Sequence, residues 1–515
     1  MAFTMSVAEL IAADTSGLLG KHPSWERVPL GDIASILNGA PFDSSFFNTD
    51  EGMPLVRIRD VISGETATYY TGPYEDGYLV QRGDLLVGMD GDFNSGFWRS
   101  ETALLNQRVC KISANHALYD NRLLAYALPG YLAAINANTP SVTVKHLSSK
   151  TISEIELPLP PRAEQSRIVA KLEELLSDLD AGVAELKAAQ KKLKQYRQSL
   201  LKAAVEGALT ADWREAQRKQ GTPTETSAQL LARILTERRA RWEAKQLAKF
   251  KERGKAPPKD WQQKYPEPVK PDIDELSPLP EGWVWASVDQ LCIVIRGASP
   301  RPAGDPRYFG GRIPWITVGS ITRDDGMYLL GTEEFVTEAG RAASRYIEAG
   351  TLLLTNSGAT LGVPKISKID GCINDGSVAL LDVDEVTKVY LYWFLKTQTE
   401  RLRALNQGAA QPNLNTDIVR RIVVPLCPPD EQQEVIRRIE STNAASRSQE
   451  DAVVRALNQS VAQRQNILRA AFRGHLVPQD PSDEPAESLL ARVRSERLAQ
   501  NMSTRNSRRK SVAGK

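Results

Sequence analysis

Residues 158–165 read PLPPRAEQ, and they open a long helical pattern that continues to Thr210. Proline is favoured in the first turn of a helix, and Glu164 lies near the positive end of the helix dipole. Apolar or small residues then recur at alternating steps of three and four, which is the spacing of a coiled-coil seam. The seam positions are Leu172, Leu175, Leu179, Gly182, Leu186, Ala189, Leu193, Tyr196, Leu200 and Ala203. One helix cannot bury this seam alone, so the pattern requires a partner helix.

The chain contains a second copy of the same stretch. Residues 425–432 read PLCPPDEQ, and the two copies align without a gap at an offset of 267 positions. They also end alike, with LKAAVEG at 201–207 and LRAAFRG at 468–474. Apolar residues of the second helix continue the seam at Val454, Leu457, Val461, Leu468 and Phe472, whereas Thr442, Ser446 and Gln449 interrupt it. We therefore expect the second helix to pack on the first within one chain.

A globular stretch precedes each long helix and opens on a tryptophan, Trp25 in the first and Trp283 in the second. Each mixes short strand patterns with one helical pattern, which predicts a mixed α/β domain. Strands are expected at 54–58, 84–88, 152–157, 311–318, 351–355 and 422–424, and helices at 119–135, 227–249 and 389–405. The two globular stretches match each other far less well than the two helices do.

These patterns predict seven segments. They are a weakly structured lead (1–23), a first domain (24–157), a central helical region (158–250), a proline-rich linker (251–281), a second domain (282–424), a second helical region (425–500) and a disordered basic tail (501–515). The fold class is α+β with an internal pseudo-two-fold repeat.

Composition narrows the functional class. The net charge is +2, and four cysteines lie far apart without a Cys-x-x-Cys pair, which favours a reducing compartment over a zinc site or a disulfide framework. Neither a secretion signal nor a run of apolar residues long enough to cross a membrane is evident, so we expect a cytoplasmic protein. The charge is uneven: residues 1–157 carry 11 basic and 18 acidic groups, whereas 158–250 carry 18 and 12.

The duplicated order of motifs resembles the specificity subunit of type I restriction-modification systems. The resemblance is carried by the proline-rich helix starts that end in Glu-Gln, Leu159 to Gln165 and Leu426 to Gln432, and by the helix ends Leu201 to Gly207 and Leu468 to Gly474. The tryptophan that opens each domain and the QPNL run at 411–414 add to it. No single motif is specific, but their duplicated order covers residues 24–500.

The resemblance implies a DNA-recognition scaffold without catalysis of its own. Each globular domain would be a target recognition domain for one half of a split sequence in double-stranded DNA, and two long antiparallel helices would hold the domains apart. Two modification (methyltransferase) subunits would bind and methylate adenine N6 with S-adenosylmethionine. Restriction/translocase subunits that use ATP and Mg would join them. We expect no cofactor in this chain.

Polar and basic residues in loops are the candidate DNA contacts. They are Asp92, Asn94, Arg99, Arg108 and Lys145 in the first domain, and Arg296, Arg301, Asn356, Ser357, Thr360, Gln411 and Asn413 in the second. Amides can pair with adenine edges, and arginine with phosphate or guanine. Each has a structural alternative as well, because the same residues occur in tight turns and solvated loops, and the amides of Gln411, Asn413 and Asn415 can also cap a helix.

The sequence contains none of the common catalytic signatures: it has no phosphate-binding glycine loop, no His-Glu-x-x-His and no Asn-Pro-Pro-aromatic run. Asp90, Asp92, Asn94 and Glu101 have the spacing of a calcium loop, but Ser95 occupies the position that requires glycine. The main alternative function is a coiled-coil adaptor whose two domains bind protein or another ligand. The acidic first domain predicts weak DNA binding by the chain alone, because phosphate neutralisation supplies much of the affinity.

Overall fold

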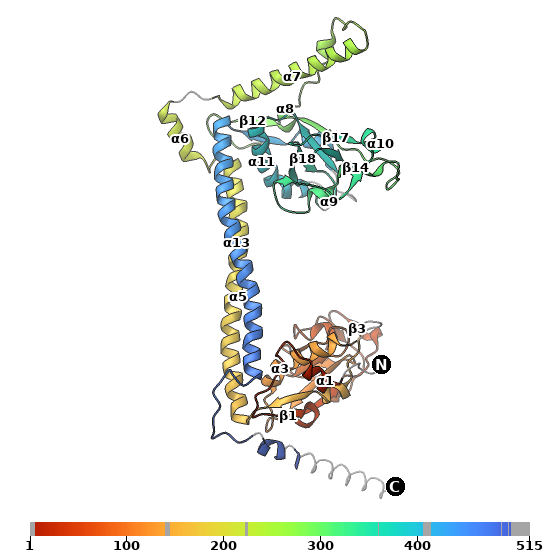
Figure 1. Cartoon of the computed structure of the whole chain (residues 1–515), viewed down its shortest axis with the longest axis vertical. Helices are drawn as coiled ribbons and strands as arrows, with labels where there is room; N and C mark the ends of the chain where they lie inside the picture. The colour runs from red at the N-terminus through yellow and green to blue at the C-terminus, as the bar shows by residue number, and fades with distance from the viewer. Residues whose placement is uncertain are drawn as a thin grey trace. The chain divides into compact units, whose positions relative to one another are not determined.

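The computed structural model describes residues 6–139, 145–221, 225–358, 360–404, 414–485, 487–492 and 494–495. The chain forms two compact units, and each combines one globular head with parts of both long helices. Unit 1 comprises Met1–Lys187 and Val454–Lys515, and unit 2 comprises Ala188–Val453. The unit boundary therefore passes through both long helices, α5 (Arg162–Val205) and α13 (Pro429–Phe472), which are labelled in Figure 1.

Unit 1 contains the first head and the short helix that precedes it. Its helices besides the long ones are α1 (Val7–Ala12), α2 (Leu30–Ile33), α3 (Asn121–Ala137) and α4 (Ser149–Ser153). Its strands are β1 (Glu26–Pro29), β2 (Ala34–Asn38), β3 (Phe47–Asn48), β4 (Met53–Val56), β5 (Tyr69–Tyr70), β6 (Leu79–Val80), β7 (Leu85–Gly88), β8 (Ser95–Phe97), β9 (Ala103–Leu105), β10 (Val109–Ala114) and β11 (Glu156–Leu159). They form a ribbon, β1-β11, and two sheets, β2-β10-β7-β8 and β3-β5-β4-β9-β6.

Unit 2 contains the second head. Its helices are α6 (Ala211–Gln220), α7 (Ser227–Glu252), α8 (Val288–Leu291), α9 (Val318–Ile321), α10 (Glu338–Ala342), α11 (Glu385–Ala404) and α12 (Thr416–Arg420). Its strands are β12 (Val284–Ser287), β13 (Ile293–Arg296), β14 (Phe309–Ile316), β15 (Tyr328–Leu329), β16 (Phe335–Val336), β17 (Arg345–Ile347), β18 (Leu352–Thr355), β19 (Pro364–Ser367), β20 (Gly371–Ile373), β21 (Ser377–Leu381) and β22 (Val423–Leu426). They form a ribbon, β12-β22, and two sheets, β13-β21-β18-β19-β15 and β16-β14-β20-β17.

The two heads share an arrangement of strands and one helix, which we call the frame, although their sequences match poorly. In both, an antiparallel ribbon leads into the long helix, and one sheet begins with strands in the same relative order, β2-β10-β7-β8 and β13-β21-β18-β19. A helix of 17 residues packs on this sheet in head 1, and one of 20 residues does so in head 2. Buried positions of strands and helices tolerate different apolar residues when volume and pattern are kept. Two heads with different sequences can therefore have the same frame.

The core of each unit includes residues from both long helices. In unit 1, Trp25, Leu124 and Leu172 are buried together with Ile467 and Phe472 of α13. In unit 2, Trp283 and Tyr390 share one cluster with Ala204 of α5 and with Val435 and Ile439 of α13. Each head is thus joined to the helices by a continuous apolar core.

The two long helices run antiparallel within each unit. In unit 1, Asp180 accepts a hydrogen bond from Arg464, while Arg167 near the start of α5 binds Asp483 beyond the end of α13. In unit 2, Arg197 pairs with Glu450 at 2.8 Å, and Asp212 beyond the end of α5 pairs with Arg438 at 2.7 Å. The predicted pairing of the helices inside one chain is confirmed.

The seam differs from the predicted one at three positions. Tyr196, Val454 and Val461 are exposed by 53%, 45% and 62%, so the prediction that they belong to the seam is wrong. In α13 the buried or half-buried row lies one residue earlier, at Val453, Ser460 and Ile467, and upstream it includes Thr442 and Ser446. Apart from Tyr196, the first helix keeps its seam, since Leu172 and Leu200 are buried and Leu175, Leu179, Leu186 and Leu193 are half-buried. Leu457 and Leu468 of α13 are also half-buried.

Two local expectations are also corrected. The lead is structured from Ser6 onward, because Ser6 caps α1 and Leu10 and Leu19 enter the core of unit 1. The strand expected at 152–157 lies later, at Glu156–Leu159, because the hydroxyl of Ser148 accepts from the backbone of Thr151 and starts the short helix α4. The predicted tail, 501–515, lies outside the described residues.

Candidate nucleic-acid interface

A buried Trp–Glu hydrogen bond fixes each head to the start of its helix. The Trp25 indole donates to Glu164 at 3.1 Å, and the Trp283 indole donates to Glu431 at 2.8 Å. Both carboxylates are almost fully buried. We call each of these pairs a hub. The duplicated tryptophan and glutamate are therefore structural residues that set how a head is mounted.

The glutamine after each glutamate completes the hub. Gln165 accepts from the backbone of Asp120 and donates to the carbonyl of Pro160, and Gln432 donates to the carbonyl of Cys427. A tyrosine hydroxyl from each head also donates to the proline-rich run, from Tyr119 to Pro158 and from Tyr390 to Pro425. Sequence reasoning found the repeated Glu-Gln but not these contacts with the heads, because Trp25, Asp120 and Trp283 lie 139, 45 and 148 positions away from their partners.

A glycine ends each long helix in the left-handed backbone region, with φ of 75° at Gly207 and 71° at Gly474. A side chain there would collide with Pro280 in unit 2 or with His22 in unit 1, so glycine is required for both reasons. Each helix end thus packs just before the tryptophan that opens a head.

In head 2, the predicted contacts gather around one turn, Asn374 to Gly376, between β20 and β21. Arg296 donates to the carbonyl of Asp375 at 3.0 Å, and Arg301 pairs with the carboxylate of Asp375 at 3.2 Å. Ser357 lies against Gly376, and Thr360 lies in the turn after β18. The structure therefore brings together Arg296, Arg301, Asn356 and Ser357, whereas the carbonyl of Thr360 accepts from the hydroxyl of Thr355 at the end of β18.

The carboxylate of Asp375 organises this cluster. The hydroxyl of Ser299 donates to it at 2.6 Å, and this bond, with the nearby Arg301 guanidinium, lowers the pKa of the carboxyl below its usual value. Arg301 itself remains largely exposed. It therefore keeps donors free for a phosphate or a guanine edge.

Asn356 is the unusual member of the cluster. Its side chain is fully buried, and neither Oδ1 nor Nδ2 has a hydrogen-bond partner among the residues that the structure describes. Its backbone is held on both sides, donating to Gly376 at 2.9 Å and accepting from Leu414 at 2.7 Å. Because a buried amide without partners is costly, Asn356 is the candidate in this cluster whose polar atoms most need a further partner.

The corresponding turns of head 1 gather most of its candidates. Asp90 pairs with Arg108 at 3.3 Å and with His146 at 2.6 Å. Lys145 donates to the backbone carbonyl of Asn136 at 2.6 Å, and its own carbonyl accepts from Gly91. Asp92 is exposed, whereas Oδ1 of Asn94 is buried without a partner in the described part of the chain.

The same backbone pattern places these turns in both heads. Met89 occupies the place of Asn356, since it donates to Arg108 and accepts from Leu147. Gly39 and Gly297 each pack directly on an asparagine carbonyl, that of Asn106 or Asn374, where any side chain would collide with backbone. We call this shared set of turns the turn edge of each head. It was missed in the sequence because only a few glycines and asparagines mark it.

The remaining candidates fall elsewhere. Arg99 lies beyond β8, at the far end of β7 from the turn edge, so the structure separates it from the others. Asn415 caps α12 by accepting from Ile418 at 2.8 Å, which supports the structural alternative for that residue. Gln411 and Asn413 lie outside the described residues.

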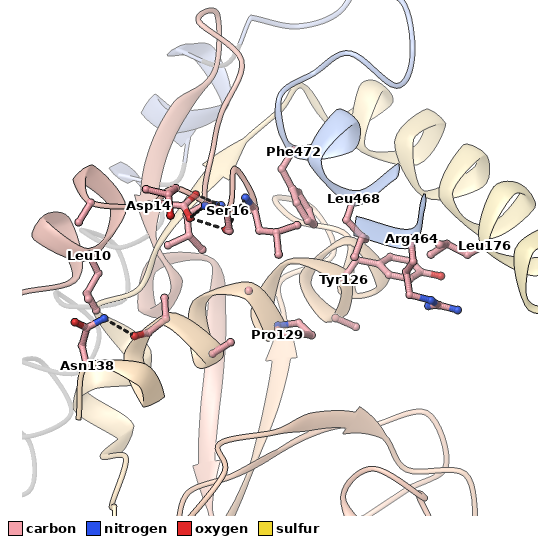
Figure 2. A pocket seen from close by; sticks show the side chains of 18 residues that line it. Leu10, Asp14, Ser16, Tyr126, Pro129, Asn138, Leu176, Arg464, Leu468 and Phe472 are labelled. Carbon is pink, nitrogen blue, oxygen red and sulfur yellow. Dashed lines mark hydrogen bonds between the residues drawn. The ribbon is translucent and has the colours of Figure 1, made fainter. Parts of the chain in front are cut away.

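A separate apolar pocket of about 550 Å³ lies inside unit 1, between the lead, α3 and the ends of the two helices. Figure 2 shows Leu10, Tyr126 and Pro129 with Leu468 and Phe472 along its wall. Asp14 accepts from the backbone and hydroxyl of Ser16 at one rim and so shapes the lead there. The pocket is lined largely by carbon and carries no cluster of catalytic groups.

Within the described residues, no group of three or more His, Cys, Asp or Glu side chains is placed to hold a metal ion, and the calcium reading of residues 90–101 gains no support. All four cysteines are free and buried. No helix of the described chain is both long and apolar enough to cross a membrane.

Comparison with known proteins agrees with this arrangement. Residues 23–191 and 280–452 each match the family model described as the type I restriction modification DNA specificity domain. The chain is 35% identical over 514 residues to the type I restriction enzyme EcoBI specificity subunit of Escherichia coli, covering 97% of this chain and 98% of that one. It is 23% identical over 490 residues to the EcoDI specificity subunit of Escherichia coli, covering 93% and 97%.

The fold has a counterpart among solved structures. A chain from a structure described as "Structural basis underlying complex assembly and conformational transition of the type I R-M system" aligns with a TM-score of 0.60 at 18% identity. The alignment covers 88% of this chain and 98% of that one.

Two heads with repeated DNA specificity domains define a protein of DNA target recognition. The chain belongs to the family of type I restriction-modification specificity subunits. The resemblance inferred from the duplicated motifs is confirmed.

Proposed function

We propose that this chain recognises a bipartite target in double-stranded DNA, one half with each head, and carries no catalytic step itself. The observation that supports this most strongly is the pair of hubs: two heads of different sequence are joined to similar helix starts by the same tryptophan–glutamate hydrogen bond. The same attachment to the helices, used for two heads of different sequence, fits a DNA target whose two half-sites differ. The turn edges are the surfaces we assign to DNA contact.

The long helices serve in this proposal as a spacer between half-sites. Each has 44 residues, and a helix rises 1.5 Å per residue, so each is about 66 Å long. Half-sites on one face of a duplex lie about 34–36 Å apart. The helices are therefore long enough to determine the number of unread base pairs.

Catalysis would belong to partner subunits. Two modification subunits would bind the helical region and methylate adenine with S-adenosylmethionine, and restriction subunits would use ATP and Mg. Because head 1 is acidic, we expect weak DNA binding by the isolated chain and tight binding only in the complex. Tight sequence-specific binding by the purified chain would contradict this expectation.

Base-modification sequencing of the host genome tests the proposal. Deleting the gene should remove methyladenine from one split motif, and restoring the intact gene should return it. An unchanged pattern of methylation would contradict the proposal and favour an adaptor that binds other ligands.

A further inference from the structure

The segment after the first long helix forms a hairpin rather than a loose linker. Trp242 of α7 stacks on Trp261 of the returning chain, with ring centroids 5.8 Å apart, and Tyr265 meets Trp242 edge-on at 5.4 Å. Phe250 adds an edge contact to Trp261. We call residues 238–265 the basic hairpin. The prolines of the linker had predicted an extended segment with little core, and these aromatic contacts correct that expectation.

The basic hairpin is fixed to head 2. Arg238 donates to the carbonyl of Cys292 at 3.0 Å and pairs with Asp289, whose carboxylate also accepts from the backbone of Val269 at 3.0 Å. Helix α7 contacts α8 and β12 of that head, and Figure 1 shows it passing over them. A surface on the hairpin therefore has a defined position beside the domain it accompanies.

The basic hairpin carries a strong positive charge, and four of its cations are regularly spaced. Residues 238–264 contain ten Lys and Arg against three Asp and Glu. Four of the cations, Arg241, Lys245, Lys249 and Arg253, follow one another at four-residue steps, so they form a row along the last turns of α7 that ends at its C-cap residue, Arg253. All four are exposed, and none has an ion-pair partner among the residues that the structure describes.

This row is unfavourable for the helix by itself. Like charges four residues apart repel, and the helix dipole compensates only cations in the last turn, which leaves Arg241 and Lys245 unexplained. The neighbouring Arg239 is paired with Glu243, so the helix does use ion pairs elsewhere. The four consecutive row positions from Arg241 to Arg253 carry one sign of charge, and the acidic residues Glu237 and Glu252 lie near the two ends of the row.

We propose that the row binds the phosphate backbone of the DNA next to the half-site recognised by head 2. The row spans about 18 Å at 1.5 Å per residue, a length over which one DNA strand presents about five phosphates. The inference rests on the proposed function and extends it, because it assigns sequence-independent affinity to a surface outside both heads.

Charge complementarity favours DNA over an acidic protein surface. The heads carry 11 basic and 18 acidic groups in residues 1–157, and 15 of each in 282–424, so phosphate neutralisation must come largely from elsewhere. The block Leu-Leu-Ala-Arg occurs at 230–233, in α7, and again at 489–492. The sequence that follows the second copy is also basic, with six Lys and Arg and no acidic residue in 497–515. Positive charge thus accompanies both copies of the block.

The test compares two triple variants of the full chain in complex with its modification subunits. Arg241→Gln, Lys245→Gln and Lys249→Gln together remove three charges, while Arg241→Lys, Lys245→Arg and Lys249→Arg keep them. Glutamine is a good helix former and relieves the repulsion, so the glutamine variant should melt at or above the wild-type temperature. Lysine and arginine have similar helix propensities, so the charge-keeping variant should melt close to the wild type. Binding to a target duplex and to a scrambled duplex is measured from 50 to 300 mM salt.

The glutamine variant should lose about three units of slope in the plot of log affinity against log salt on both duplexes, and the charge-keeping variant should match the wild type. Unchanged slopes in the glutamine variant would overturn the inference. Weakened assembly with the modification subunits in the absence of DNA, with slopes unchanged, would also overturn it and assign the row to an acidic protein surface. Equal binding of both duplexes by the wild type would instead refute the proposed function, and the slopes on the scrambled duplex would still decide the inference.

Discussion

Glu164 and Glu431 accept the same tryptophan hydrogen bond but differ in what surrounds them. Glu431 also binds Arg214 at 2.9 Å and the hydroxyl of Thr210 at 2.7 Å, so its charge is compensated. Glu164 has Gln479 in that place. Burial therefore raises the pKa of the Glu164 carboxyl above its usual value, although the bonds from Trp25 and Gln479 act against the shift.

Glutamine substitution of each hub glutamate should expose this difference. Glu431→Gln leaves the guanidinium of Arg214 without its buried partner and should cost about 3 kcal/mol in unit 2. Glu164→Gln removes no ion pair and should lower the stability of unit 1 by about 1 kcal/mol at neutral pH. Hydrogen exchange in the β1-β11 and β12-β22 ribbons reports the two units separately. Equal losses in both ribbons would contradict the distinction.

The raised pKa of Glu164 also predicts a pH dependence. A carboxyl whose pKa is higher in the folded state contributes most stability below its unfolded pKa, and that contribution is lost as pH rises through the folded value. The stability difference between Glu164→Gln and wild type should therefore shift in favour of the variant as pH increases from 4 to 7. Denaturant titration of both proteins across this range measures it, and a shift toward the wild type would refute the assignment.

Asn356 offers a test of the turn edge. The equivalent residue in head 1 is Met89, so Asn356→Met fits the frame and removes two unpartnered polar atoms. We expect unit 2 to gain about 1 kcal/mol, because the cost of the buried amide disappears. Thermal denaturation checks this.

The same substitution should abolish or change the half-site recognised by head 2 and leave the other unchanged, as base-modification sequencing would show. Asn415→Ala is the matched control: it removes the cap of α12 and costs about 1 kcal/mol without changing the target. An unaltered target in Asn356→Met would exclude Asn356 from recognition.

At the scale of elements, the long helices show what periodicity can and cannot predict. Steps of three and four identified α5 and its seam, because a long amphipathic pattern admits few alternatives. In α13 the apolar residues Val454 and Val461 suggested a seam that the structure moves by one residue. The hub at Glu431 and the core contacts of Val435 and Ile439 fix the rotation of the helix at its start, and the small residues Thr442 and Ser446 then face inward.

The corrected seam gives a paired prediction in unit 1. Ile467 is buried in the core, so Ile467→Ala should cost about 2–4 kcal/mol through lost burial and a cavity. Val461 is mostly exposed, so Val461→Ala should change stability by about 0.5 kcal/mol or less. Urea denaturation of the two variants compares them directly. A larger loss of stability in Val461→Ala than in Ile467→Ala would contradict the corrected seam and support the one predicted from the sequence.

The turn edges could not be predicted as assemblies. Arg108, Lys145 and Asp90 come from three separate segments, and their meeting depends on the order of β10, β7 and β8 in the sheet, which no local pattern encodes. Even so, four of the five head 1 candidates lie at one edge, since loops that follow adjacent strands meet there. Arg99 does not, because β8 carries the chain back to the other end of β7.

At the scale of the whole molecule, the spacer proposal predicts a change in distance without a change in sequence. Four residues inserted near Ala189, and four near the repeat-equivalent Ala456, would lengthen both helices by about 6 Å. One base pair rises about 3.4 Å, so the unread gap should grow by about two base pairs. Base-modification sequencing should show both half-sites unchanged. Altered half-sites would show that the helices and heads do not act separately.

The division of the chain into units has a consequence for its synthesis. Unit 2 is a continuous segment, Ala188–Val453, whereas unit 1 needs the last part of α13 to cover Leu172 and Leu176. Translation proceeds at about 5–20 residues per second, so head 1 leaves the ribosome several tens of seconds before Phe472 is made. The second head should therefore fold to completion before the first. During that interval the apolar residues Leu172 and Leu176 of the nascent chain are exposed. We therefore expect a chaperone that binds exposed apolar helices to bind this segment.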